Sequence, residues 1–435
     1  MSFRSGSVSY SRFRVFGEAP AALDESFLKR LADHMIRPTP GTAPPEVEAG
    51  WTAGRHILDG GFTSDGCLFG PTLLAGVRVD TNRVPTEVRR AYRALAESER
   101  AAATETGFLS RGERRLARDE ADRRCGEELA TGRHRRSRLL PVHWAIENET
   151  LLAPVSGDRL ANTLRDLVQN TFGLRLQSRS AGSIAWDLLA DRGLANDLDD
   201  ALPSVFTAAP PQAELRKEER VDRRSSGPEV PWAAAGPEPK DFLGNEFLLW
   251  LWWLCEEDEG LVATRMGEVG VVIDKVLDME CAWGATGKQS LRGEAVTRLP
   301  EADRALALGK WPRRAGLILS AKGQQWELSF QADRFAVGGA KLPDPDDKPA
   351  SVRELLEHRL AAIADLDATL VALFESFLRQ RIDSGWSGKC ERIGTWIKTR
   401  GKAAPARHRG IEASRHQGVE TPEPVDVVVG DVSVA

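Results

Sequence analysis

The residues from Phe242 to Cys255 form the most apolar stretch of this 435-residue chain, and they restrict its fold more than any other segment. A helix that is apolar on every side is normally buried between layers of structure. The stretch is shorter than the roughly 20 residues that cross a bilayer, so we expect no membrane partner. Tryptophans such as Trp250, Trp252 and Trp253 can also stack on nucleic-acid bases. Because these three cover more than one helical face, a place in the core is favoured.

The first part of the chain repeats one pattern of hydrophobic periodicity, strand then helix then strand, on either side of residues 84–138. We therefore predict an α/β (α+β) protein in which two related β-α-β units, within 1–83 and 139–195, form one sheet. The predicted elements are strands Val8–Phe16 and Thr72–Asp80 with helix Ala21–His34, and strands Leu139–Ile146 and Leu174–Leu176 with helix Gly157–Thr171.

Residues 241–382 predict a second α/β domain, which contains a second sheet and a long C-terminal helix. Its clearest signals are a hairpin across Lys322-Gly323 and an amphipathic helix over Ser351–Ile382. Seven prolines and a run of mixed charge make residues 203–240 a linker or a mobile insertion. The polar tail, 401–435, is expected to be disordered.

The arm, defined here as Val84–Arg138, is unusually rich in arginine. Pro85 suits the start of a helix, and a polar break is expected near Gly107–Gly112. Four positions spaced i, i+3, i+4 and i+7 share one arc of a helix surface, and we call them the arginine stripe: Arg111, Arg114, Arg115 and Arg118. Asp119 and Asp122 face part of the stripe in the less favourable order. Further arginines of the arm are Arg123, Arg124, Arg133, Arg135, Arg136 and Arg138.

The overall charge limits what this basic segment can do. The net charge of the chain is −5, so a DNA contact requires basic residues gathered on one surface and acids elsewhere. A basic stripe with spare charge is what contact with a phosphate backbone needs. Two other interpretations remain open: an ordinary solvated helix face, and a charged projection that binds a protein partner or a second copy of the chain.

No catalytic motif in the sequence has all the residues that its chemistry requires. We therefore predict a non-enzymatic protein with no cofactor and no metal. Gly284–Ser290 resembles a phosphate-binding loop, but position 282 is Ala282 and Lys288 is followed by Gln289. The seven histidines lack the spacing of metal ligands, and His143 in a predicted strand is expected to be packed. Five separated cysteines fit a reducing cytosol. Met1–Arg14 has no signal-peptide core.

The order of several weak motifs resembles the recombination-associated protein RdgC family of bacteria. Gly50-Trp51 follows the first strand and helix, and Pro85 begins a long charged arm. Trp144 lies in the strand that follows the arm, and Gly309-Lys310 precedes a hairpin of alternating apolar residues. A long helix closes the pattern, which covers most of 1–195 and 290–380.

This resemblance implies a homodimeric ring that encloses double-stranded DNA without sequence specificity or catalysis and restrains recombinase filaments. Single-stranded DNA is a further candidate partner, and the implied location is the cytoplasm, associated with the nucleoid. The resemblance places the tip of the subunit at the arm. It also suggests a second basic patch: Lys288, Arg292, Lys310, Arg313 and Arg314. Ordinary solvation of strand ends is the other interpretation of these five residues. The chain departs from the family in its insertion, its longer 260–290 segment, its tail, and the arginines of 133–138 where the family has aromatic residues.

Overall fold

The computed structural model describes residues 3–18, 20, 22–37, 42–104, 107–209, 238–284, 286–345 and 347–400. Most of the predicted insertion (210–237) and the whole predicted tail (401–435) lie outside the described residues. The elements of the first half are β1 (Val8–Phe16), α1 (Glu25–Asp33), β2 (Val47–Thr52), α2 (Ser64–Cys67), β3 (Leu68–Phe69), β4 (Thr72–Asn82), α3 (Thr86–Ala102), α4 (Arg111–Ala130), β5 (Arg135–Ala145), β6 (Thr150–Ala153), α5 (Asp158–Phe172), β7 (Arg175–Ser178), α6 (Ala181–Ala190) and α7 (Ala195–Asp200).

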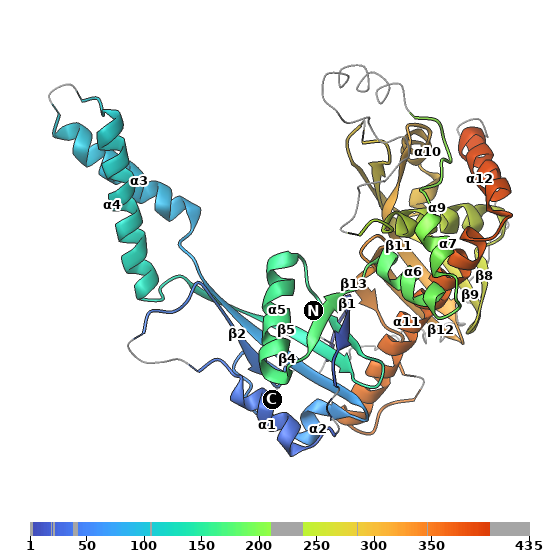
Figure 1. Cartoon of the computed structure of the whole chain (residues 1–435), viewed down its shortest axis with the longest axis horizontal. Helices are drawn as coiled ribbons and strands as arrows, with labels where there is room; N and C mark the ends of the chain where they lie inside the picture. The colour runs from blue at the N-terminus through green and yellow to red at the C-terminus, as the bar shows by residue number, and fades with distance from the viewer. Residues whose placement is uncertain are drawn as a thin grey trace, which may run out of the picture. The chain divides into compact units, whose positions relative to one another are not determined.

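The remaining elements follow the insertion (Figure 1). They are α9 (Phe242–Glu257), β8 (Leu261–Thr264), β9 (Gly267–Cys281), β10 (Gln289–Gly293), the 3-10 turn η1 (Val296–Arg298), α10 (Pro300–Ala307), β11 (Lys310–Ala321), β12 (Gln324–Gln331), β13 (Ala336–Lys341), α11 (Val352–Arg381) and α12 (Trp386–Arg400). The mixed α/β class and the long C-terminal helix are therefore confirmed, and the hairpin across Lys322-Gly323 is present.

One antiparallel sheet runs through both predicted sheet regions, because β1 belongs to both. The strand order is β10-β9-β11-β12-β13-β1-β6-β5-β4-β2, and β3, β7 and β8 pair beside this path. The start of β1, at Val8 and Tyr10, pairs with β13. Its second half pairs with β6 along one edge and with β7 along the other. The same nine-residue strand thus holds the two parts of the sheet together.

Two hydrophobic clusters lie against this sheet. The first fills the space between the N-terminal strands and the helices α1 and α5, and it includes Trp51 and Trp144. The second surrounds α9, where Trp250 and Trp252 are fully buried. The interpretation of the apolar stretch as core is confirmed. Phe247 of α9 packs edge-on against Phe374 of α11, with ring centroids 5.4 Å apart.

Three strands of the structure differ from those that the hydrophobic periodicity predicts. The glycines of Gly50-Trp51 and Gly60-Gly61 predict a connection before the second strand. Gly50-Trp51 instead belongs to strand β2, where a side chain at Gly50 would collide with the backbone at Ile36. The apolar patterns of Val269–Ile273 and Val276–Trp283 predict two strands, but both belong to one strand, β9, with Lys275 at a φ of 63°. Strand β5 starts at Arg135 instead of Leu139, because Arg135–Arg138 continue the pairing with β4.

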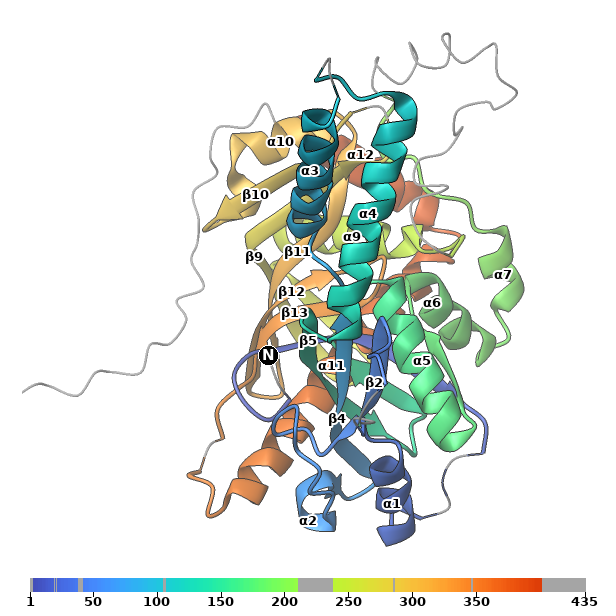
Figure 2. The ribbon, with the colours of Figure 1, turned by 90° about the vertical axis from the view of Figure 1, so that its left-hand side faces the viewer.

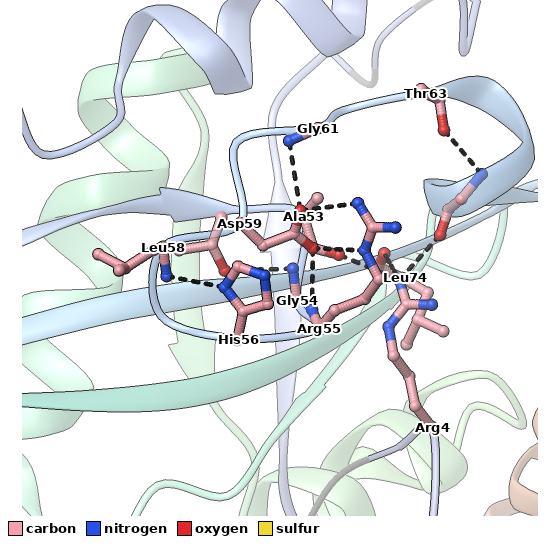
Figure 3. Close-up of polar contacts among 12 residues, drawn as sticks. Arg4, Ala53, Gly54, Arg55, His56, Leu58, Asp59, Gly61, Thr63 and Leu74 are labelled. Carbon is pink, nitrogen blue, oxygen red and sulfur yellow. Dashed lines mark hydrogen bonds and ion pairs between the residues drawn. The ribbon is translucent and has the colours of Figure 1, made fainter.

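The loop after β2 is held by a single buried carboxylate (Figure 3). Asp59 is 3% exposed and accepts two hydrogen bonds from the Arg55 side chain, at 2.9 Å each, and others from the backbone N–H groups of Arg55 and Gly61. Arg4 reaches the same region and donates to the carbonyl oxygens of Ala53 and Leu74. The bonds from Arg55 lower the pKa of Asp59 from 3.8 to about 2.

We expect Asp59→Asn to destabilise the protein by about 2 kcal/mol at pH 7, because the folded state favours the charged carboxylate. The depressed pKa gives a contribution that is complete well above pH 3.8 and is lost as the pH falls through about 2. Urea unfolding of the two proteins should therefore differ near neutral pH and converge between pH 4 and 2. Asp65→Asn is the control, since that side chain is fully exposed. A difference that does not depend on pH would contradict the role of the charge.

Candidate nucleic-acid interface

Two helices, α3 and α4, form a hairpin inserted between strands β4 and β5 (Figures 1 and 2). Pro85 is the N-cap of α3, so the helix starts where the proline predicts. Helix α4 begins with a capping box, in which the Ser110 side chain accepts from the N–H of Glu113 and the Glu113 carboxylate accepts from the N–H of Ser110. These local signals fix the break that is expected near Gly107–Gly112.

The hairpin has a thin interface built from small residues. The buried positions are Ala96 of α3 with Ala117, Ala121 and Cys125 of α4. Small side chains let the helices approach closely but bury little apolar area, so polar contacts contribute more of the specificity. Those that cross between the helices are Arg89–Asp122 at 3.3 Å, Arg124–Glu99 at 3.4 Å and Tyr92–Glu128 at 2.5 Å.

The arginine stripe lies on the exposed surface of α4. Arg111, Arg114, Arg115 and Arg118 are all exposed, and none of their side chains has an ion-pair or hydrogen-bond partner among the described residues. The acid expected to face Arg118, Asp122, pairs with Arg89 of α3 instead. The acid expected to face Arg115, Asp119, forms no ion pair with it. The four charges of the stripe are therefore available to an outside anion.

The other predicted site residues of the hairpin, Arg123, Arg124 and Arg133, pair with acids within it. Arg123 pairs with Glu120 and Glu127, and Arg124 pairs with Glu120 at 2.8 Å, as the i,i+4 spacing predicts. Arg133 lies 3.4 Å from Glu128. Glu128 also accepts from His134, and these contacts lower its carboxyl pKa. The structure thus divides the predicted site residues of the hairpin into two groups. The arginine stripe has no ion-pair partner among the described residues, and the others pair with acids of the hairpin.

Strand alternation divides the arginines of β5 in the same way. Arg135 points to one face, where it contacts Asp80 at 2.6 Å and Glu48 at 2.9 Å. Arg136 and Arg138 share the register positions of Thr81 and Val79, are exposed, and have no side-chain partner among the described residues. Two further cations near this end of the sheet are Arg83 and Arg159. Their spacing along the chain does not predict that they lie together, because their proximity depends on strand register.

The predicted second basic patch comes together on strands β10 and β11 and the turn before them, but acids surround it. Arg292 lies 2.8 Å from Asp278, and Arg313 pairs with both Glu280 and Asp333. Lys288 lies 3.4 Å from Glu280. Lys310 and Arg314 donate to Gln289 and Ser329. This patch therefore offers less free charge than the arginine stripe does.

The arm as a whole is basic within an acidic chain. It contains fourteen arginines and ten acidic residues, a net charge of +4, whereas the whole chain carries −5. The remainder of the chain is accordingly strongly acidic. Segregation of this kind can hold a polyanion on one surface of a molecule with negative net charge.

The described part of the chain can be compared with the requirements of a metal site and of a membrane span. No cluster of three His, Cys, Asp or Glu side chains that could hold a metal is found there, and no described helix is long and apolar enough to cross a membrane. His143 is packed as expected: it is 4% exposed and lies 5.7 Å from the ring of Phe3. Burial lowers the pKa of His143 to about 4, so the ring is neutral at pH 7.

Comparison with known proteins gives no family model and no curated protein that matches this chain. The resemblance to the RdgC family therefore stays a prediction from the order of motifs.

The small apolar interface between α3 and α4 can be tested by mutation. Replacing buried Ala121 by Glu should destabilise the pairing of α3 and α4 by about 3 kcal/mol, because the new side chain is both too large and charged. Hydrogen exchange should then speed up within Thr86–Ala102 and Arg111–Ala130 and stay unchanged in the core strands. Ala94→Glu, at an exposed position of α3, is the matched control. Equal exchange in the two variants would show that the helices do not depend on each other.

Proposed function

We propose that the chain is a non-catalytic protein that binds duplex DNA without sequence specificity, through the arginine stripe of α4. One observation carries the proposal: four exposed arginines stand on one helix surface, and the acids that could neutralise them are engaged elsewhere or form no ion pair with them. Arginine side chains without partners are what phosphate oxygens bind best, because the guanidinium group can donate two parallel hydrogen bonds.

Lack of sequence preference follows from the kind of contact. Phosphate contacts position a protein on DNA, whereas base edges carry the sequence information. The stripe consists of arginines alone, and Trp250 and Trp252 are buried in the core, whereas Phe108 near the start of α4 is 83% exposed. The stripe therefore offers affinity for the DNA backbone, and the exposed Phe108 ring offers at most stacking, which does not distinguish one base sequence from another.

A role in homologous recombination extends this proposal. It rests on the resemblance to the RdgC family, which implies a homodimer that forms a ring or clamp around DNA and limits recombinase filaments. The unpaired stripe on a hairpin that leaves the sheet between β4 and β5 is consistent with an arm that embraces a duplex (Figure 2). Nucleoid association in the cytoplasm belongs to the same proposal.

Salt dependence of binding tests the function directly. If the protein neutralises six to ten phosphates, its affinity for a random duplex should fall about 10³–10⁵-fold between 50 and 200 mM salt. Changing Arg111, Arg114, Arg115 and Arg118 to Ala should weaken binding to all sequences alike. It should also reduce the slope of log K against log salt by about 3.6, at about 0.9 per phosphate lost. Fluorescence anisotropy with labelled duplexes measures both quantities.

The matched control removes the same charge from the same arm. Arg90, Arg93, Arg123 and Arg124 all pair with acids of the hairpin, so changing these four to Ala should leave the salt slope nearly unchanged. An equal loss in both quadruple variants would mean that net charge, not contact by the stripe, attracts DNA. Binding that does not respond to salt would exclude the proposal.

A second candidate is a protein-interaction module. Leu95 of α3 and Leu116 of α4 are 52% and 51% exposed, which places apolar surface on the same hairpin. If the chain is an interaction module, the unchanged protein should self-associate and should not shift a labelled duplex in a gel. The double variant Leu95→Ser/Leu116→Ser should lose the self-association.

A further inference from the structure

A cavity of about 480 Å³ lies where the arm joins the sheet, and we call it the root pocket. Its volume is within the range of about 300–1,000 Å³ typical of sites for small ligands. Strands β2, β4 and β5 form one wall, and the first two turns of α5 with the residues before them form the other. The lining residues are Val47, Val79, Thr81, Arg136, Ser137, Arg138, Ser156, Gly157, Asp158, Arg159, Leu160 and Thr163.

Strand register explains why two arginines meet in this pocket. Val47 pairs with Thr81, and Thr81 pairs with Arg136, so the three lie in one row across β2, β4 and β5. Val79 and Arg138 form the next row on the same face. Arg135 points to the opposite face, where acids bind it, and the pocket therefore receives the two arginines of β5 whose side chains contact no acid among the described residues.

The charge of the pocket is positive and largely uncompensated. Arg136, Arg138 and Arg159 line it, and Asp158 is the one acid among the lining residues. Arg159 lies 2.8 Å from Glu46, but both side chains are well exposed, at 60% and 66%, so this pair is weak and easily exchanged. An anion that enters the pocket would meet two arginines with no competing carboxylate bound to them.

The rest of the lining is not that of a simple phosphate site. Val47, Val79 and Leu160 supply an apolar surface, and Ser156 and Thr163 bring hydroxyl groups. A ligand that fills this space has a phosphate at one end and a flat or apolar body with a few polar edges at the other. A nucleoside phosphate has this chemistry, whereas inorganic phosphate leaves the apolar part empty.

We propose that the root pocket binds a free nucleoside phosphate, with the phosphate held by Arg136 and Arg138 and the base against Val47, Val79 and Leu160. This site is separate from the arginine stripe and does not depend on the proposed DNA binding. Because the ligand would bridge β5 and α5, its binding also stabilises the root of the arm.

Isothermal titration of the full chain with ADP, inorganic phosphate and adenosine tests the proposal. ADP should bind at least about tenfold more tightly than either fragment, since only ADP fills both parts of the pocket. Arg136→Ala/Arg138→Ala should weaken ADP binding about 30-fold, as expected for the loss of two charge-assisted contacts. Both side chains are exposed and unpartnered among the described residues, so the fold should tolerate the change.

The control is Arg111→Ala/Arg114→Ala, which removes equal charge from the stripe. It should leave ADP binding unchanged and weaken duplex binding. No ADP binding by a protein that still binds duplex DNA would overturn the root pocket alone, and ADP binding without duplex binding would overturn only the proposed function. Equal affinity for inorganic phosphate and ADP would overturn the assignment to a free nucleotide. One-for-one displacement of ADP by duplex DNA would also overturn it, because the pocket would then bind a phosphate of the DNA backbone.

Discussion

The pairing of β4 with β5 is the constraint on which the rest of the arm and its chemistry depends. Eleven consecutive residues of each strand pair without a shift, from Thr72 opposite Ala145 to Asn82 opposite Arg135. The inner end buries Trp144, and the outer end carries the helical hairpin. A slip of one residue would exchange the faces of every side chain. Arg136 and Arg138 would then face the acids that now hold Arg135.

Strand β1 provides the second constraint, because it joins the two hydrophobic clusters. Its early residues pair with β13 and its later ones with β6 and β7. Side chains reinforce the junction: Arg12 lies 2.6 Å from Asp367 of α11, and Arg14 lies 3.0 Å from Asp187 of α6. Burial raises the pKa of Asp367, and the nearby Arg12 guanidinium offsets part of this increase. The sheet that supports the arm is thereby tied to the helices of the second cluster.

Hydrophobic periodicity predicted the helices and strands that have a regular helical or alternating pattern of buried residues. It failed for strands whose position depends on a tertiary contact. Helices α5, α9 and α11 and the β11–β12 hairpin have clear helical or alternating patterns and lie within a few residues of their expected bounds. Strand β2 escaped detection because Gly50 resembles a turn until its close approach to Ile36 is known. The start of β5 escaped because four charged or polar residues, Arg135–Arg138, conceal a strand whose pairing with β4 sets its direction.

The candidate site shows the same division between local and tertiary information. Spacing alone identified the stripe, but it assigned Asp122 to Arg118, whereas the structure gives that acid to Arg89 of the neighbouring helix. The i,i+4 spacing also assigns Asp119 to Arg123. In the structure Arg123 pairs with Glu120 and Glu127 instead, and Asp119 forms no ion pair among the described residues. The contact of Asp122 with Arg89 removes the acid that the helical spacing assigns to Arg118. The packing of α3 on α4 therefore decides how much of the arm's positive charge can act on an external anion, and the free charge is a property of the hairpin and not of α4 alone.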